Sequence, residues 1–188
     1  MNNNFIASIH NYRLSAIAPV GPEAVVSLII SEITDGYISV ADITAGRVKD
    51  YTNGESALDL RMKPMGDFKE ILIDEIKSTM FADQSGEENE KFLVLGCLDE
   101  QLVGFAIFTV NPVEGSNEKY ANLEDILVGN CFQHQGYATK ILHTIETFLK
   151  NEGVSFAILE SSLKNHNTHL FVEKEGFQKV SYSYYKRL

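Results

Sequence analysis

The chain has 188 residues, of which 44% are apolar and 22% charged, and its formal net charge is −10. This length fits one compact domain, and an acidic chain lacks the basic face that nucleic-acid phosphates require, so we expect no nucleic-acid partner. The longest apolar run, residues 24–30, is interrupted by Ser27 and is too short to cross a membrane.

The N-terminus and the cysteines indicate the compartment. Residues 1–4 lack the basic and apolar regions of a signal peptide. Cys97 and Cys131 lie far apart and show no disulfide framework. Both observations favour a reducing, cytoplasmic environment. The acidic charge suits a cationic substrate, because an acidic cleft raises the local concentration of amines.

The N-terminal half has few regular patterns. Partial alternation over residues 5–18 predicts a first strand, which prolines end. Pro22 suits the first turn of a helix over residues 23–34. Residues 37–66 are irregular, and Asp67 then suits the N-cap of a helix over residues 68–81.

The middle of the chain reads as a platform of strands. Residues 92–98 and 102–110 are apolar and separated by a short polar turn, which predicts a buried hairpin. Residues 111–117 form a loop, and residues 120–128 return as a third antiparallel strand.

The most informative stretch is residues 123–153, which reads as strand, tight turn and helix. Apolar residues recur at helical spacing from Ala138 to Leu149, and Gly153 ends the run. A strand over residues 154–160 follows, and a strand–helix–strand unit predicts that it pairs in parallel with residues 120–128. A helix over residues 167–175 and an aromatic strand over residues 177–185 complete the chain.

The turn before this helix has the features of an anion site. The first turn of a helix leaves several backbone N–H groups unpaired at the positive end of the helix dipole, and such a site binds phosphate. Gly136 lets the main chain approach an anion, and Ala138 keeps the first helical turn thin. Each N–H to phosphate bond contributes on the order of 1.5–3 kcal/mol, so a few of them hold a ligand without a lysine.

At this point the residues resemble a known family. The pattern Gln133-x-x-Gly136-x-Ala138 resembles the Arg/Gln-x-x-Gly-x-Gly/Ala signature of the GNAT superfamily of N-acetyltransferases. The preceding strand resembles that of spermidine-type polyamine acetyltransferases. The resemblance runs from about residue 91 to the C-terminus, and in the family this signature holds the pyrophosphate of acetyl-CoA.

The resemblance implies an α/β (α+β) fold in one domain, residues 1–188. It predicts a mixed, mostly antiparallel sheet of about six to seven strands with helices on both faces. A V-shaped splay at a bulge would separate the fourth and fifth strands. Residues 1–90 would carry the substrate-capping helices, and residues 91–188 would form the acetyl-CoA-binding core.

The same resemblance assigns the binding residues. Acetyl-CoA would be the co-substrate, with pantetheine bonded to main chain near Leu127 and Val128. His134 and Gln135 would contribute main-chain N–H groups rather than side chains. The residues expected to bind acetyl-CoA are Ile126, Leu127, Val128, Gln133, His134, Gln135, Gly136, Tyr137, Ala138, Thr139 and Asn165.

We expect no metal and no cysteine nucleophile. His166 and His169 are three residues apart at a helix start, but no third ligand has suitable spacing, so a surface pair is favoured. Cys131 has no recognisable histidine partner and is interpreted as a packed thiol.

Transfer to an amine requires removal of a proton. An alkyl ammonium ion has a pKa near 10.4, so about one molecule in 2,500 is neutral at pH 7, a deficit of roughly 4.6 kcal/mol. A carboxylate in reach accepts the proton and attracts the cation. Glu124 is our candidate base and Asp125 a second contact. As strand neighbours, we expect them to point to opposite faces.

The general acid is where the sequence departs from the family. The family pattern places a tyrosine where this chain has Val172, and valine cannot donate a proton. Tyr185 is our first candidate, and Tyr184 or His166 are alternatives. The thiolate of CoA also has a pKa low enough to leave without help.

These observations predict an acetyl-CoA-dependent N-acetyltransferase. The acceptor would be a primary amine of a small cationic molecule or of a protein lysine, attacked directly in a ternary complex. The alternative, motivated by Val172, is a weakly catalytic acyl-CoA-binding module that acts as a sensor or scaffold. The sequence does not decide between an acetyl and a longer acyl group, or between a monomer and a homodimer.

Overall fold

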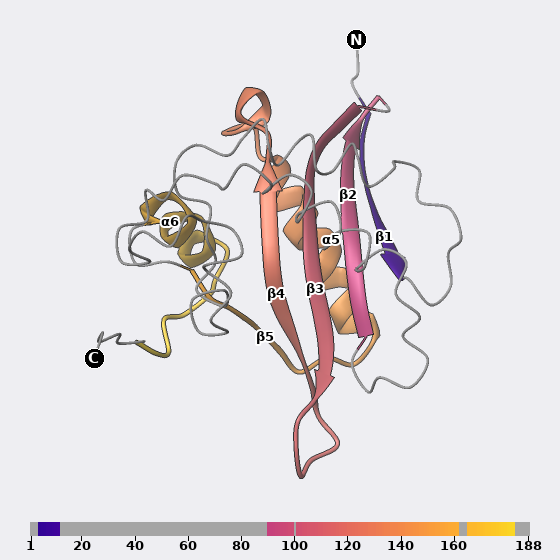
Figure 1. Cartoon of the computed structure of the whole chain (residues 1–188), viewed down its shortest axis with the longest axis vertical. Helices are drawn as coiled ribbons and strands as arrows, with labels where there is room; N and C mark the ends of the chain where they lie inside the picture. The colour runs from indigo at the N-terminus through magenta and orange to yellow at the C-terminus, as the bar shows by residue number, and fades with distance from the viewer. Residues whose placement is uncertain (1–3, 12–89, 100, 162–164, 183–188) are drawn as a thin grey trace, which may run out of the picture.

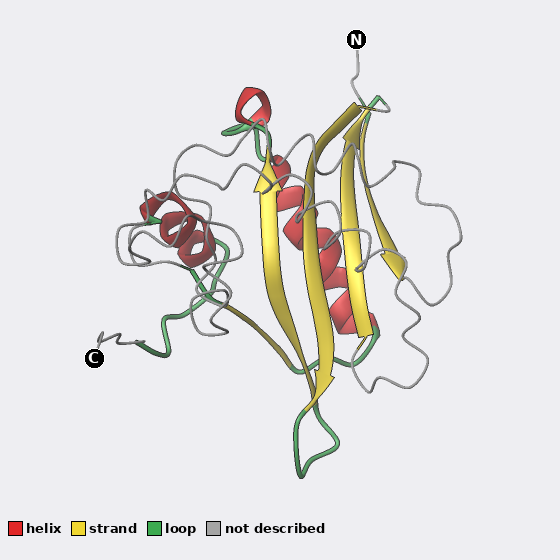
Figure 2. Cartoon of the chain, in the orientation of Figure 1, coloured by secondary structure: helices red, strands yellow, loops and turns green. Residues whose placement is uncertain are grey.

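The computed structural model describes residues 4–11, 90–99, 101–161 and 165–182. These residues form a five-stranded sheet in the order β1-β2-β3-β4-β5, with α helices beside it (Figures 1 and 2). The strands are β1 (Phe5–Asn11), β2 (Glu90–Leu98), β3 (Gln101–Pro112), β4 (Lys119–Val128) and β5 (Phe156–Leu159). The helical elements are the 3-10 turn η1 (Asn130–Phe132), α5 (Tyr137–Asn151) and α6 (His166–Lys174).

The topology of the sheet agrees with the predicted fold class. Strands β1 to β4 pair antiparallel, and β5 pairs with β4 in parallel. Helix α5 connects β4 to β5, so the predicted strand–helix–strand unit is confirmed. The predicted hairpin is β2 and β3, and the predicted third strand is β4. Within the described ranges, no helix is both long and apolar enough to cross a membrane.

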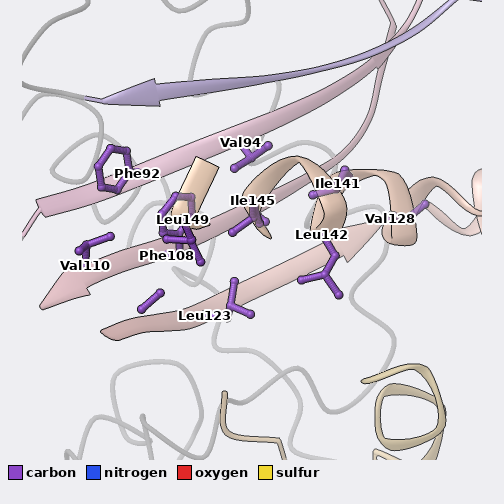
Figure 3. Packing of buried hydrophobic residues seen from close by; sticks show 12 residues of the cluster. Phe92, Val94, Phe108, Val110, Leu123, Val128, Ile141, Leu142, Ile145 and Leu149 are labelled. Carbon is purple, nitrogen blue, oxygen red and sulfur yellow. The ribbon is translucent and has the colours of Figure 1, made fainter. Parts of the chain in front are cut away.

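Helix α5 packs its apolar stripe on one face of the sheet (Figure 3). Its buried residues are Ile141, Leu142, Ile145 and Leu149. On the sheet, the ring of Phe92 stacks on that of Phe108 with centroids 4.8 Å apart, and Phe148 meets Phe92 edge-on at 4.9 Å. Each such aromatic pair adds about 0.5–1.5 kcal/mol beyond the area it buries. This core holds the N-terminal end of α5 beside the end of β4.

Two glycines let α5 lie close to the sheet. A Cβ added to Gly96 would lie 2.9 Å from Cδ1 of Ile141. One added to Gly104 would lie 2.7 Å from the carbonyl oxygen of Leu127 and 3.1 Å from the same Ile141 atom. Both distances are shorter than carbon and oxygen atoms tolerate without a shift. The absence of side chains here therefore sets the height of α5 above β2 and β3.

The other face of the central strands is also buried. Leu93, Leu95, Phe105 and Ile107 alternate with the residues that face α5, and they are 7% exposed or less. A sheet with both faces buried is typical of α/β proteins. The helices predicted over residues 23–34 and 68–81, and residues 12–18 of the first predicted strand, lie outside the described residues.

The C-terminal part agrees only in part with the prediction. Helix α6 forms as expected and is followed by Gly176 at a φ of 95°, and it lies on the same side of β4 as β5 (Figure 1). Residues 177–182, however, do not form the predicted strand, and residues 183–185 lie outside the described part. Alternating aromatics favour a strand only where a partner strand accepts their main chain, and none of the described strands pairs with residues 177–182.

Candidate active site

An extra residue interrupts the pairing of β4 with β3. Asp125 lies opposite Ile107 and Leu123 lies opposite Phe108, so Glu124 has no partner on β3. Such a β-bulge bends the strand and redirects its side chains. The bulge falls at the two acids that the sequence singles out, and it agrees with the bulge that the resemblance predicts.

The bulge places both acids on one face of the sheet. Asp125 shares the face of Ile107, its neighbour across the pair, and this face is turned away from α5. Glu124 pairs with Lys91, with 2.8 Å between Oε2 and Nζ. Lys91 precedes the core residue Phe92 on β2, so its side chain points to the face opposite α5. Our expectation of opposite faces was therefore wrong, because it assumed a regular pleat. Both side chains of the ion pair are about 30% exposed, so it contributes about 0–1 kcal/mol to stability.

Beyond the bulge, β4 and β5 separate. Their pairing ends where Leu123 meets Leu159, whereas β4 continues to Val128. Gly129 donates its N–H to the carbonyl of Val103 at 3.0 Å, which fixes which residues of β4 face β3. By alternation, the main chain of Leu127 faces β3, and that of Ile126 and Val128 turns toward the side of β5. The predicted splay is confirmed. On this side of β4, no described strand pairs with the main chain of Ile126 or the N–H of Val128, whereas the carbonyl of Val128 accepts a bond from Gln133.

The turn between β4 and α5 is shaped by two left-handed residues. After η1, His134 has a φ of 60° and Gly136 a φ of 82°. The helix starts at Tyr137, four residues later than the first residue of the motif. A Cβ added at Gly136 would meet no described atom within 4 Å, so none of the described residues fills the space directly beside this turn.

Two glutamines brace the turn with their side chains. Gln133 donates from Nε2 to the carbonyl of Val128 and to Oδ1 of Asn130, both at 3.0 Å. Gln135 donates from Nε2 to the carbonyl of Cys131 at 3.0 Å. These bonds direct both side chains back toward η1 and the end of β4. The motif glutamine thus joins the phosphate turn to the open edge of β4.

The N-terminus of α5 fits an anion. No side chain caps its first amides, and its first turn contains no acid. The amides of Tyr137, Ala138 and Thr139 are therefore available at the positive end of the helix dipole. Lys140 adds a positive charge nearby, with Nζ 5.1 Å from the ring centroids of both Phe5 and Tyr137. This cation–π contact joins β1 to the turn, and the sequence analysis missed it.

A second contact missed by the sequence analysis joins α5 to the end of α6. Thr139 donates its hydroxyl to Oε1 of Glu175 at 2.7 Å, and Nε2 of His143 lies 3.3 Å from Oε2 of the same carboxylate. Only 8% of the Glu175 side chain is exposed. The hydroxyl of Thr139 is thus directed at Glu175 and away from the first amides of α5. Thr139 and Glu175 are 36 residues apart in the sequence, so no local sequence pattern predicts their contact.

The remaining candidates lie on α6 or outside the described residues. Asn165 caps α6 by accepting a bond from the N–H of Thr168 at 3.4 Å. Val172 is buried, and its side chain cannot donate a proton. The rings of His166 and His169 lie 6.2 Å apart. Tyr185, the first candidate acid, lies outside the described residues. Among the side chains that the structure describes, no group of three suits a metal.

The cysteines differ in environment. Cys131, expected to be packed, is exposed, because η1 turns it toward solvent. Cys97 is partly buried, and burial raises the pKa of its thiol. Both are free thiols.

Together these parts fit a coenzyme with a diphosphate and an extended, amide-bearing arm. The amides from Gly136 to Thr139 suit the diphosphate, and the main chain of Ile126 and Val128 suits the amides of the arm, as an added strand would. Glu124 and Asp125 lie next to this edge. The site therefore joins an anion cradle to a pair of carboxylates along one stretch of chain.

Comparison with solved structures supports the fold. Ribosomal-protein-alanine N-acetyltransferase from Brucella melitensis biovar Abortus 2308 is 13% identical, with a TM-score of 0.61 over 98% of this chain and 100% of that one. An aminoglycoside N-acetyltransferase in complex with CoA is 15% identical, with a TM-score of 0.58 over 100% and 98%. An aminoglycoside acetyltransferase from an uncultured soil metagenomic sample, in complex with sisomicin, is 14% identical, with a TM-score of 0.54 over 97% of each chain.

The sequence comparisons identify the family. A search of curated protein sequences finds no match. The model of the acetyltransferase (GNAT) family matches residues 56–177, which is more than half of the chain and includes β4, the turn and α5. The chain therefore belongs to the acetyltransferase (GNAT) family, and it is an acetyl-CoA-dependent acyltransferase.

Proposed function

We propose that the protein transfers the acetyl group of acetyl-CoA to a primary amine of a small cationic molecule, by direct attack in a ternary complex. The observation that carries this proposal is the bulge at Glu124. It places two carboxylates on one face and opens the β4 main chain beside them. A cationic amine held by the carboxylates would thus lie next to the thioester.

Each part of the site has a proposed role. The N–H groups from Gly136 to Thr139 bind the diphosphate, and the main chain of Ile126 and Val128 holds the pantetheine arm and the thioester oxygen. Glu124 accepts the proton of the amine, directly or through water. Asp125 attracts the cation. Asn165 remains a proposed CoA contact through the part of its side chain that does not cap α6.

The choice of a small cationic acceptor rests on charge. The two carboxylates attract cations, and the chain carries a formal net charge of −10. Two of the similar structures are named as aminoglycoside acetyltransferases, and one of them holds sisomicin. A protein lysine is the second acceptor class to test, because its side chain is also a cationic primary amine. Another similar structure is named as a ribosomal-protein-alanine acetyltransferase, so protein α-amines belong in the panel as well. Residues 1–90 are proposed to select between acceptors within a single domain.

The general acid is left to a group other than Val172. We propose Tyr185, with Tyr184 and His166 as alternatives, or departure of the thiolate without help. We also place the protein in the cytoplasm, since both of its cysteines are free thiols. A homodimer is compatible with this proposal.

The test is thiol release from acetyl-CoA over a panel of polyamines, aminoglycosides and lysine peptides. Glu124→Gln should lower kcat by about 10²–10⁴-fold, because a general base contributes this much, while the affinity for CoA stays unchanged. Glu146→Gln is the matched control. Glu146 pairs with Lys150 at 3.9 Å, and its side chain is 33% exposed, against 31% for Glu124.

The same assay, together with calorimetry, distinguishes the proposed function from the alternative. Val172 is buried where the family has a tyrosine, and this favours a weakly catalytic acyl-CoA-binding module as the second candidate. Calorimetry that finds CoA binding, with no amine acetylated by wild type, would support the module. Turnover that Glu124→Gln leaves intact would remove Glu124 from the role of base.

A further inference from the structure

The ion pair between Lys91 and Glu124 has a chemical consequence. Lys91 belongs to β2 and lies opposite Thr109 of β3, yet its Nζ is 2.8 Å from Oε2 of Glu124 on β4. Its side chain thus spans β3 to reach the bulge. The lysine amine is held by the same carboxylate that is proposed to take the proton from an acceptor.

Lys91 has three properties of an acceptor for this site. It carries a primary amine on a flexible stem, its side chain is 29% exposed, and it lies on the sheet face that carries Glu124 and Asp125. The open main chain of Ile126 begins two residues after Glu124. Resting on the proposed function, we propose that Lys91 is an internal acceptor, and that the protein acetylates this residue.

The reaction balances with groups already named. Glu124 takes one proton from the Lys91 ammonium, and the neutral Nζ forms a bond to the acetyl carbon. The bond between that carbon and sulfur breaks, a second proton leaves the nitrogen to solvent, and the CoA thiolate takes up a proton. The products are an acetylated Lys91, free CoA thiol and one proton, and no oxidant or further co-reactant takes part.

The modification changes the charge of the site. An acetylated lysine is neutral and no longer pairs with Glu124. The carboxylate is then released to bind an external amine. Before modification, an added acceptor competes with Lys91 for the same oxygen atoms. Acetylation of Lys91 thus converts a site that binds its own lysine into one that accepts an outside amine.

The chain offers a matched control lysine. Lys150 also pairs with a glutamate, Glu146, but on the outer surface of α5, and its side chain is 77% exposed. Uncatalysed acetylation by acetyl-CoA follows exposure and would favour Lys150. Acetylation by the site would favour Lys91, so the ratio of the two separates the mechanisms.

The experiment incubates the full chain with acetyl-CoA alone and follows acetylation at each lysine by peptide mass spectrometry. We expect Lys91 to be acetylated before Lys150, with a rate constant independent of protein concentration. Glu124→Gln should slow acetylation of Lys91 by about 100-fold or more and leave Lys150 unchanged. Lys91→Arg should lower the thiol released without an added amine to the amount that acetylation of the other lysines accounts for.

The contrary outcomes are equally defined. Lys91 modified no faster than Lys150, or at a rate unaffected by Glu124→Gln, overturns the inference. A rate proportional to protein concentration overturns its intramolecular form. Turnover of added amines is measured in parallel samples of the same protein, so that an unmodified Lys91 in a preparation that acetylates amines rejects this inference alone. If neither Lys91 nor any added amine is acetylated, the proposed function is rejected as well.

Discussion

The two halves of β4 differ in what surrounds them. Residues 120–123 lie between β3 and β5 and pair with both, and Ala121 and Leu123 pack into the core under α5. Residues 125–128 pair with β3 alone, and Glu124 pairs with neither strand. The first half has its main chain satisfied on both sides, and the second half retains polar groups that can bind a ligand. The comparison teaches that stability and chemistry occupy adjacent segments of one strand, with the bulge between them.

The largest effect on stability is expected in the first half. Leu123→Ala removes a side chain that is 6% exposed, and it should lower the free energy of unfolding by about 2–5 kcal/mol. Chemical denaturation measures this loss. Ile126→Ala is the control from the second half, where the side chain is only partly buried, and its loss should be smaller. Equal losses would show that the two halves are equally part of the core.

A change opposite the second half should affect both stability and binding. Gly104→Ala places a Cβ 2.7 Å from the carbonyl oxygen of Leu127 and 3.0 Å from Cγ2 of Val128. The resulting shift of β4 should cost about 1–3 kcal/mol and raise the KM for acetyl-CoA. In Gly96→Ala, the nearest atoms are the side-chain ends of Ile141 and Phe5, so we expect a smaller loss and an unchanged KM. A KM that rises equally in both variants would contradict the role of the β4 edge.

The turn that follows the second half can be tested with a pair of glycines. Gly136 and Gly153 have φ values of 82° and 69°, and an added Cβ meets no described atom at either. Alanine at each should cost about 1–2 kcal/mol in backbone strain. Only Gly136→Ala should weaken CoA binding in calorimetry, because Gly153 lies at the far end of α5. Weakened binding in both would indicate a general loss of helix stability.

The smallest effect concerns the brace between β4 and the turn. Gln133→Ala removes two hydrogen bonds of 3.0 Å, one of them to the carbonyl of Val128. At about 0.5–1.5 kcal/mol per bond, the Kd for CoA should rise by about 2–10-fold. Gln135→Ala removes a bond within the turn alone and should raise the Kd less. An unchanged Kd in Gln133→Ala would mean that the motif glutamine does not couple the two parts.

The regular elements were predictable from local patterns. The periodicity from Ala138 to Leu149 identified α5, and apolar runs separated by polar turns and loops identified β2, β3 and β4. Glycines marked the ends of α5 and α6 at positive φ. These signals are local, because helical and strand periods reflect which side of an element meets the core.

The arrangement of the site was less predictable. The sequence singled out Glu124 and Asp125, but their shared face follows from a register that depends on β3. The pairs Lys91 with Glu124 and Thr139 with Glu175 join residues far apart in sequence. Whether a residue lies opposite one partner or another is a tertiary property, and one sequence does not reveal it.

The bulge depends on the number of residues in β4. Glu124 is the one surplus residue on β4, and without it Asp125 would follow Leu123 in an uninterrupted ladder with β3. A strand of that kind could run straight alongside β5 and close the gap. Deletion of Glu124 would then remove the proposed base and spare the hydrophobic interior, since no core side chain changes. Under the proposed function, the activity of this chain therefore depends on the number of residues in one strand as well as on their identity.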